Sequence, residues 1–119
     1  MGTTAPIDGE VLMIATAKGS IGPRVGVLVD RVQTHLESRI VEYRRQYEAV
    51  HESDSRVVFF AEPGHWKQVG GRLGLNEREI DAIQRAHVEQ LEVIGRREGR
   101  ESEFEAALEI RDPVVIATE

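Results

Sequence analysis

Residues 67–83 read KQVGGRLGLNEREIDAI, and this stretch predicts two helices joined by a tight turn. A small residue, Gly70, is followed four positions later by Gly74, which permits a sharp reversal of the chain. Asn76 has a side chain that is preferred at a helix N-cap, and Glu79 stands at the capping-box position. Because glycine has no side chain, we expect the second helix to cross the first closely at residue 70.

The spacing in this stretch resembles the helix-turn-helix of DNA-binding proteins, whose second helix enters the major groove. The resemblance covers residues 66–95 and implies a small DNA-binding or transcription-associated protein. Arginine and glutamine can make bidentate contacts with bases. The implied DNA contacts, with the last two on the backbone, are Arg72, Arg78, Gln84, Arg85, Arg56 and Lys67.

An ordinary corner between two core helices has the same pattern, so a structural interpretation of residues 66–95 stays open. Glu77, Glu79 and Asp81 occupy the first turn of the second helix. Carboxylates stabilise the N-terminus of a helix through its dipole. They also repel phosphate, which argues against DNA at this turn.

A long apolar stripe precedes this segment, and no glycine or proline interrupts residues 27–62. Apolar residues recur there at spacings of three and four, beginning at Val25 and ending at Val50. The pattern predicts one amphipathic helix from about residue 24 to about residue 52, or two helices with a break near Glu37 and Ser38.

A single straight helix of that length would span roughly 40 Å, more than the width of a domain of this size. We therefore expect a homodimer with an interface on Val29, Val32, Leu36, Ile40, Tyr43 and Tyr47. The alternative to a DNA-binding function is a helical homo-oligomeric interaction or scaffold protein without nucleic acid or catalytic activity.

The remaining segments predict a mainly α, α+β fold in a single domain over residues 1–119. The apolar run 11–17 fits a helix or a strand, with a slight preference for a helix that Asp8 caps. Residues 56–61 are β-branched and aromatic and predict a strand, with residues 114–117 as its partner. Residues 101–110 predict a short helix.

The composition is that of a globular chain with room for one core: 119 residues, 40% hydrophobic and 30% charged. The absence of cysteine excludes disulfides and thiolate metal sites. No apolar run has the length needed to cross a bilayer. Residues 1–6 lack the basic-then-apolar pattern of a secretory signal. We therefore expect a cytoplasmic protein with no membrane partner.

The formal net charge is −6, and Lys18 and Lys67 are the only lysines. An acidic surface with little lysine suits a high-salt cytoplasm, where charges are strongly screened. A GC-rich genome, which encodes arginine in preference to lysine, would give the same composition. The acidic balance argues against an obvious nucleic-acid-binding protein, although screening in concentrated salt weakens that argument.

No cluster of side chains predicts a catalytic or metal site, and we expect no cofactor. Glu48 and His51 have the i, i+3 spacing of helical di-iron sites, but such sites need a second pair and further glutamates. Residues 18–20, KGS, end like a phosphate-binding loop but lack its preceding glycine. An enzyme is therefore the least favoured class.

Two aromatic segments have alternative interpretations. His65 and Trp66 follow a predicted turn and could line a pocket, but Trp66 as an anchor of the turn in the core is preferred. Residues 43–47, YRRQY, form the densest basic-aromatic cluster. This cluster could stack on bases or form an interface, and its tyrosines also fit the apolar stripe.

Residues 62–110 resemble small uncharacterised proteins of halophilic archaea. The resemblance rests on EPGHW at residues 62–66, RLGL at 72–75 and FEAALE at 104–109. It implies a salt-rich cytoplasm and brings no activity with it.

Overall fold

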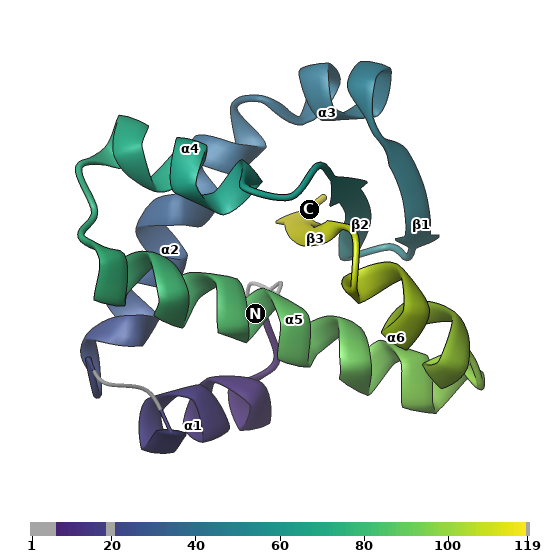
Figure 1. Ribbon diagram of the computed structural model, residues 1–119, viewed down its shortest axis with the longest axis horizontal. Coiled ribbons are helices and arrows are strands. Elements are labelled where there is room, and N and C mark those ends of the chain that lie inside the picture. The colour runs from purple at the N-terminus through teal and green to yellow at the C-terminus, as the bar shows by residue number, and fades with distance from the viewer. Residues whose placement is uncertain (1–6, 19–20, 119) are drawn as a thin grey trace.

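Six helices pack against a three-stranded antiparallel sheet in residues 7–18 and 21–118, the residues that the computed structural model describes (Figure 1). This is the mainly helical α+β fold that the sequence predicts. In chain order the elements are α1 (Gly9–Lys18), α2 (Arg24–Glu37), α3 (Ile40–Gln46), β1 (Glu48–Glu52), β2 (Arg56–Ala61), α4 (His65–Leu73), α5 (Glu77–Glu98), α6 (Glu101–Leu108) and β3 (Asp112–Ala117).

The longest helix, α5, crosses the molecule and contacts α1, α2, α4, α6 and β3 (Figure 1). Its start was predicted correctly, because the side chain of Asn76 accepts from the N–H of Glu79 and the side chain of Glu79 accepts from the N–H of Asn76, both at 2.9 Å. The helix ends at Gly99, whose φ of 70° lies in the left-handed region that glycine adopts readily. These signals are local, which is why the sequence predicts this helix well.

A single helix over residues 24–52 is wrong, and the alternative of a break near Glu37 and Ser38 is confirmed. The hydroxyl of Ser38 donates to the carbonyl of His35 at 2.6 Å, and Arg39 leaves the helical region at φ −118°. Residues 48–52 then form β1, because pairing with β2 satisfies their main-chain groups in a way that helical periodicity does not reveal.

The apolar stripe of residues 25–50, which predicted a homodimer, packs mainly into the core of the same chain. Val29, Val32, Leu36 and Tyr43 are at most 5% exposed, and Ile40 and Tyr47 are half-buried against the core. The molecule measures 35 × 31 × 28 Å, so no rod extends from its body. The homodimer and the scaffold alternative stay predictions without the stripe to support them.

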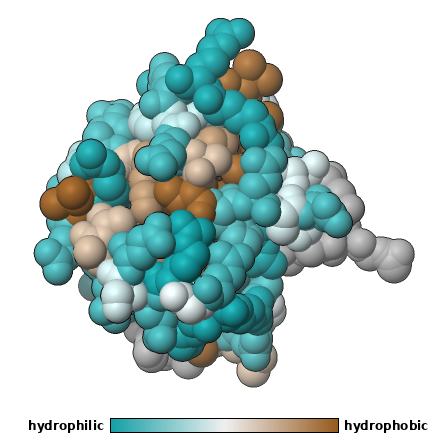
Figure 2. All heavy atoms as spheres, turned by 90° about the vertical axis from the view of Figure 1, so that its right-hand side faces the viewer, coloured by the Kyte–Doolittle hydropathy of each residue, from teal (hydrophilic) through white to brown (hydrophobic). Residues whose placement is uncertain are grey.

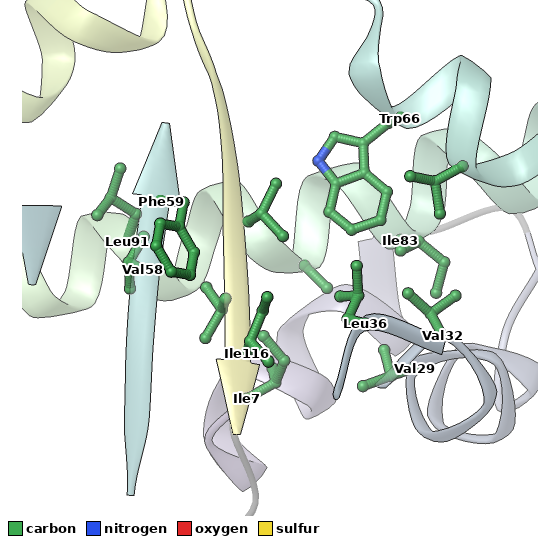
Figure 3. Packing of buried hydrophobic residues seen from close by; sticks show 14 of the residues in the cluster. Ile7, Val29, Val32, Leu36, Val58, Phe59, Trp66, Ile83, Leu91 and Ile116 are labelled. Carbon is green, nitrogen blue, oxygen red and sulfur yellow. The ribbon is translucent and has the colours of Figure 1, made fainter. Parts of the chain in front are cut away.

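The core lies between the sheet and the helices. Figure 3 shows Trp66 above Ile83, Val32 and Leu36 at one end of this core. Phe59 of β2 is fully buried on the sheet side. The run 11–17 lies in α1, which confirms the helical preference. The carboxylate of Asp8, expected as its cap, bonds to Arg56 and Gln90.

The strand order is β1-β2-β3, so β3 lies at an edge, and buried side chains occupy its outer main-chain groups. The amide of Gln33 donates to the carbonyl of Val115 at 2.6 Å and accepts from the N–H of Ala117 at 3.1 Å. The pairing of β2 with β3, which the sequence predicts, runs antiparallel from Arg56 opposite Ala117 to Ala61 opposite Asp112.

Two further side chains complete this edge. The N–H of Val115 donates to Nδ1 of His87 at 2.9 Å, and the indole N–H of Trp66 donates to the carbonyl of Pro113 at 3.0 Å. Trp66 is 2% exposed, so its predicted role as an anchor in the core is confirmed.

The face at the right of Figure 1, where β1 and α6 lie, is mostly hydrophilic (Figure 2). Apolar atoms gather near its middle. Partly accessible large apolar side chains in this region are Val50 of β1, Phe60 of the neighbouring β2, Leu108 of α6 and Ile110 of the turn that follows α6. No described helix is long and apolar enough to cross a membrane. Residues 1–6 and the pair Gly19 and Ser20 of the phosphate-loop-like stretch lie outside the described residues.

Candidate functional site: a polar pocket between α3 and α4

The corner between α4 and α5 has the close crossing that the sequence predicts. A Cβ atom at Gly70 would overlap Cγ1 and Cδ1 of Ile80. Gly74 ends α4 at φ 73°, and the N–H of Leu75 donates to the carbonyl of Gly70 at 2.9 Å. Glycine at residue 70 is therefore what lets the two helices touch.

The side chains that the helix-turn-helix interpretation places on DNA fall into two groups in the structure. Lys67, Arg72, Arg78 and Arg85 are exposed. Two others have partners inside the protein. Gln84 is half-buried and donates to Asp112 at 3.4 Å, and the predicted backbone contact Arg56 is 9% exposed with its guanidinium 2.8 Å from Asp8.

One predicted contact, Arg72, borders a polar pocket of about 250 Å³. One wall is the end of α2 and α3, which contribute His35, Arg39 and Tyr43. The opposite wall is α4, where residues 65, 68 and 72 lie on one face at helical spacing. The pocket therefore joins two helices that the strands β1 and β2 separate in the chain.

A buried tyrosine–histidine pair forms the floor of this pocket. The hydroxyl of Tyr43 lies 2.6 Å from Nε2 of His65, and the two residues are 5% and 7% exposed. Their rings meet edge to face with centroids 5.5 Å apart. The turn after β2 places His65 here, because Gly64 takes a φ of 90° and the N–H of His65 donates to the carbonyl of Glu62 at 3.1 Å.

Burial keeps both members of the pair neutral near pH 7. It raises the pKa of Tyr43 well above its ordinary value and lowers the pKa of His65. Nδ1 of His65 lies 3.9 Å from a carboxylate oxygen of Glu62, beyond hydrogen-bond distance. That negative charge favours the tautomer with its hydrogen on Nδ1, so the hydroxyl of Tyr43 donates to Nε2. Nδ1 is buried and finds no hydrogen-bond partner among the described residues.

Two charged side chains that line the pocket, Arg72 and Glu62, have no close ion-pair partner among the described side chains. Arg39 uses its guanidinium on both oxygens of Glu42 at 3.2 Å. Glu62 accepts a hydrogen bond from the hydroxyl of Tyr47 at 3.2 Å. Arg72 makes no ion pair or side-chain hydrogen bond with any side chain that the structure describes. The charges left for a ligand are those of Arg72 and Glu62.

One sequence feature pointed to this pocket: His65 follows a predicted turn and could line a cavity. His35, Arg39 and Glu62 were missed, because they are ordinary surface residues until α3 and α4 come together. His35 has a buried Nε2 without a partner in the described residues, and its pKa is lowered by burial and then by Arg39 and Arg72.

The other predicted clusters serve the fold. Arg44 of the basic-aromatic cluster pairs with Glu52 at 2.9 Å. Glu48 and His51 lie on a strand, so their i, i+3 helical spacing is lost, and His51 lies 2.9 Å from Glu98. No group of three potential metal ligands occurs in the described part of the chain.

Comparison with protein families shows that the chain belongs to the family described as Domain of unknown function (DUF8048), whose model matches residues 5–118. Comparisons with curated proteins and with solved structures gave no match. The haloarchaeal source and the cytoplasmic location stay predictions.

Proposed function

We propose that this DUF8048 domain binds a small polar molecule in the pocket between α3 and α4. The observation that carries the proposal is the unpaired guanidinium of Arg72 beside the buried Tyr43–His65 pair. The guanidinium of Arg72 has no ion-pair partner among the described side chains, so it can donate to a carboxylate or another acceptor group of a ligand. At about 250 Å³ the pocket is smaller than the roughly 300–1,000 Å³ of typical ligand sites, which favours a small ligand.

The neutral protonation states of Tyr43 and His65 favour ligand binding over catalysis. A general base works best with a pKa near the operating pH. Burial instead lowers the pKa of His65 and holds Tyr43 protonated. A neutral, hydrogen-bonded pair of this kind orients a ligand without taking a proton from it.

The test is a panel of small polar compounds measured by thermal shift and then by calorimetry. A ligand that binds only the folded state at a hundred times its Kd stabilises it by about 2.7 kcal/mol. We expect at least one compound to raise the melting temperature, and Arg72→Gln to abolish that rise. Arg78→Gln is the matched control, because Arg78 is also exposed but lies on α5 outside the pocket. No stabilising compound, or equal loss in both variants, overturns the proposal.

We propose duplex DNA binding by the α4–α5 corner as a second candidate, which the close crossing at Gly70 favours. Its support is weaker, since Glu77 and Asp81 flank Arg78 on the exposed face of α5. The test is fluorescence anisotropy with a labelled duplex at two salt concentrations. Arg78→Ala with Arg85→Ala should weaken binding and reduce its salt dependence, while Arg45→Ala on α3 should not. Absence of binding at low salt contradicts this candidate.

A further inference from the structure

Two of the charged side chains that line the pocket pair with each other, and the two that remain indicate which charges a ligand should carry. Arg39 and Glu42 neutralise each other across two contacts of 3.2 Å. What remains is one positive group, Arg72, and one negative group, Glu62, on the same cavity. These two do not meet within the 4.0 Å of an ion pair in the described structure.

We infer that the pocket accepts a small zwitterion, a molecule with one carboxylate and one ammonium group, bound between Arg72 and Glu62. This inference rests on the proposed function. A purely anionic ligand would be attracted by Arg72 but repelled by Glu62. A purely cationic ligand would be attracted by Glu62 but repelled by Arg72. A zwitterion satisfies both groups and adds no net charge to the site.

Neutral groups beside each charge suit the same ligand. Gln68 lies one helical turn before Arg72 on α4 and borders the pocket, so its amide can donate to a carboxylate beside the guanidinium. At the other end Tyr47 donates to Glu62, and the ring of Tyr47 lies 5.6 Å from that of His65. Aromatic faces beside a carboxylate are the surroundings in which proteins hold ammonium groups.

The spacing of the two ends sets the length of the ligand. His65, beside Glu62, precedes Arg72 by seven residues on α4, a rise of about 10 Å along the helix axis. Glu62, in the turn before α4, and Arg72, near the end of α4, both line the same pocket. A ligand that bridges them carries its charges several bonds apart.

The experiment compares zwitterions with their single-charge fragments by calorimetry. The probes are glycine, β-alanine and 4-aminobutyrate, together with their single-charge fragments acetate, propionate, butyrate, methylammonium, ethylammonium and propylammonium. We expect one of the amino acids to bind at least about tenfold more tightly than either matching fragment, which corresponds to about 1.4 kcal/mol. We also expect the affinity to change along the chain-length series.

Two variants assign the ends. Glu62→Gln should weaken binding of the zwitterion about tenfold and leave carboxylate binding equal or stronger, whereas Arg72→Gln should weaken both. The matched controls are Glu77→Gln and Arg78→Gln, which change exposed charges outside the pocket. Circular dichroism of each variant establishes that it folds, and both changed pocket residues are on the surface.

The outcomes separate the two proposals. A carboxylate that binds as tightly as its amino acid, or binding of the amino acid that Glu62→Gln leaves unchanged, overturns the zwitterion and leaves the pocket as a ligand site. The zwitterion inference also fails, and the pocket remains a ligand site, if the amino acids do not bind but another compound of the panel binds in a way that depends on Arg72. If neither the amino acids nor the panel bind, both proposals fail.

Discussion

The first two residues of α4 lie about 100° apart around the helix axis and meet different surroundings. His65 borders the polar pocket, whereas Trp66 packs in the core with its ring centroid 4.4 Å from that of His87. His65 and His87 are both buried, and each has one ring nitrogen without a partner among the described residues. Burial alone lowers the pKa of His87 to about 3. Around His65 the carboxylates of Glu62 and Asp112 oppose the effect of burial.

The comparison teaches that burial of a histidine does not mark a site by itself. His87 is sealed among apolar groups, and its bonded nitrogen accepts from a strand, so it belongs to the fold. His65 is also buried, but it shares a cavity with unpaired charges. The following changes test this division, beginning with the core face of α4.

Trp66→Ala should have the largest effect, a loss of about 3–5 kcal/mol in the free energy of unfolding. The change removes a fully buried ring and leaves the carbonyl of Pro113 without its donor. Urea denaturation followed by circular dichroism measures it. Trp66→Phe restores much of the volume and should cost less. Equal stability of Trp66→Ala and the natural protein would show that this face is not the core.

His87→Leu should cost about 1–3 kcal/mol near pH 8, because the buried N–H of Val115 loses its acceptor. Its effect should shrink as the pH falls. The folded pKa of His87 is lowered to about 3, so the unfolded chain takes up the proton first. The natural protein therefore keeps this contribution above pH 6.5 and loses it as the pH falls from 6.5 towards 3.

Urea denaturation of both proteins at several pH values between 4 and 8 measures this difference. The comparison with the variant is needed because His35 and His65 also have lowered pKa values and contribute to the same pH range. A gap between the two proteins that stays constant with pH would mean that His87 does not titrate on unfolding.

Gly70→Ala and Gly71→Ala should change stability in opposite directions. A Cβ at Gly70 overlaps Ile80, and overpacking of this kind costs about 1–3 kcal/mol. A Cβ at Gly71 meets nothing within 4 Å, so alanine there should stabilise α4 by about 0.5–1 kcal/mol. Thermal unfolding of the pair measures the difference. Destabilisation by both changes would contradict the close crossing.

Tyr43→Phe should cause the smallest loss of stability, about 0.5–1.5 kcal/mol, since it removes one hydrogen bond and keeps the ring. Its larger effect should be on the ligand, because His65 then loses the hydrogen bond that orients its ring in the pocket. Calorimetry with the best compound of the panel, beside urea denaturation, separates the two. A loss of stability as large as that of Trp66→Ala would place the Tyr43–His65 pair in the core instead of in a site.

Sequence reasoning succeeded where the determining contacts are local. The capping box of Asn76 and the glycines at 70 and 74 act within a few residues, and they define the α4–α5 corner. It failed at residues 48–52, whose strand depends on pairing with β2. The pocket could not be predicted for a similar reason, because no local pattern states that Tyr43 and His65 meet.

The outer edge of β3 has a consequence for how this protein can associate. Unpaired main-chain groups along a sheet margin are a template on which a foreign strand can grow. Here the side chains of Gln33, Trp66 and His87 occupy those groups on β3. Their amide, indole and imidazole groups lie where a fourth strand would pair. The sheet therefore cannot be extended at β3, and aggregation by strand addition is blocked on that edge.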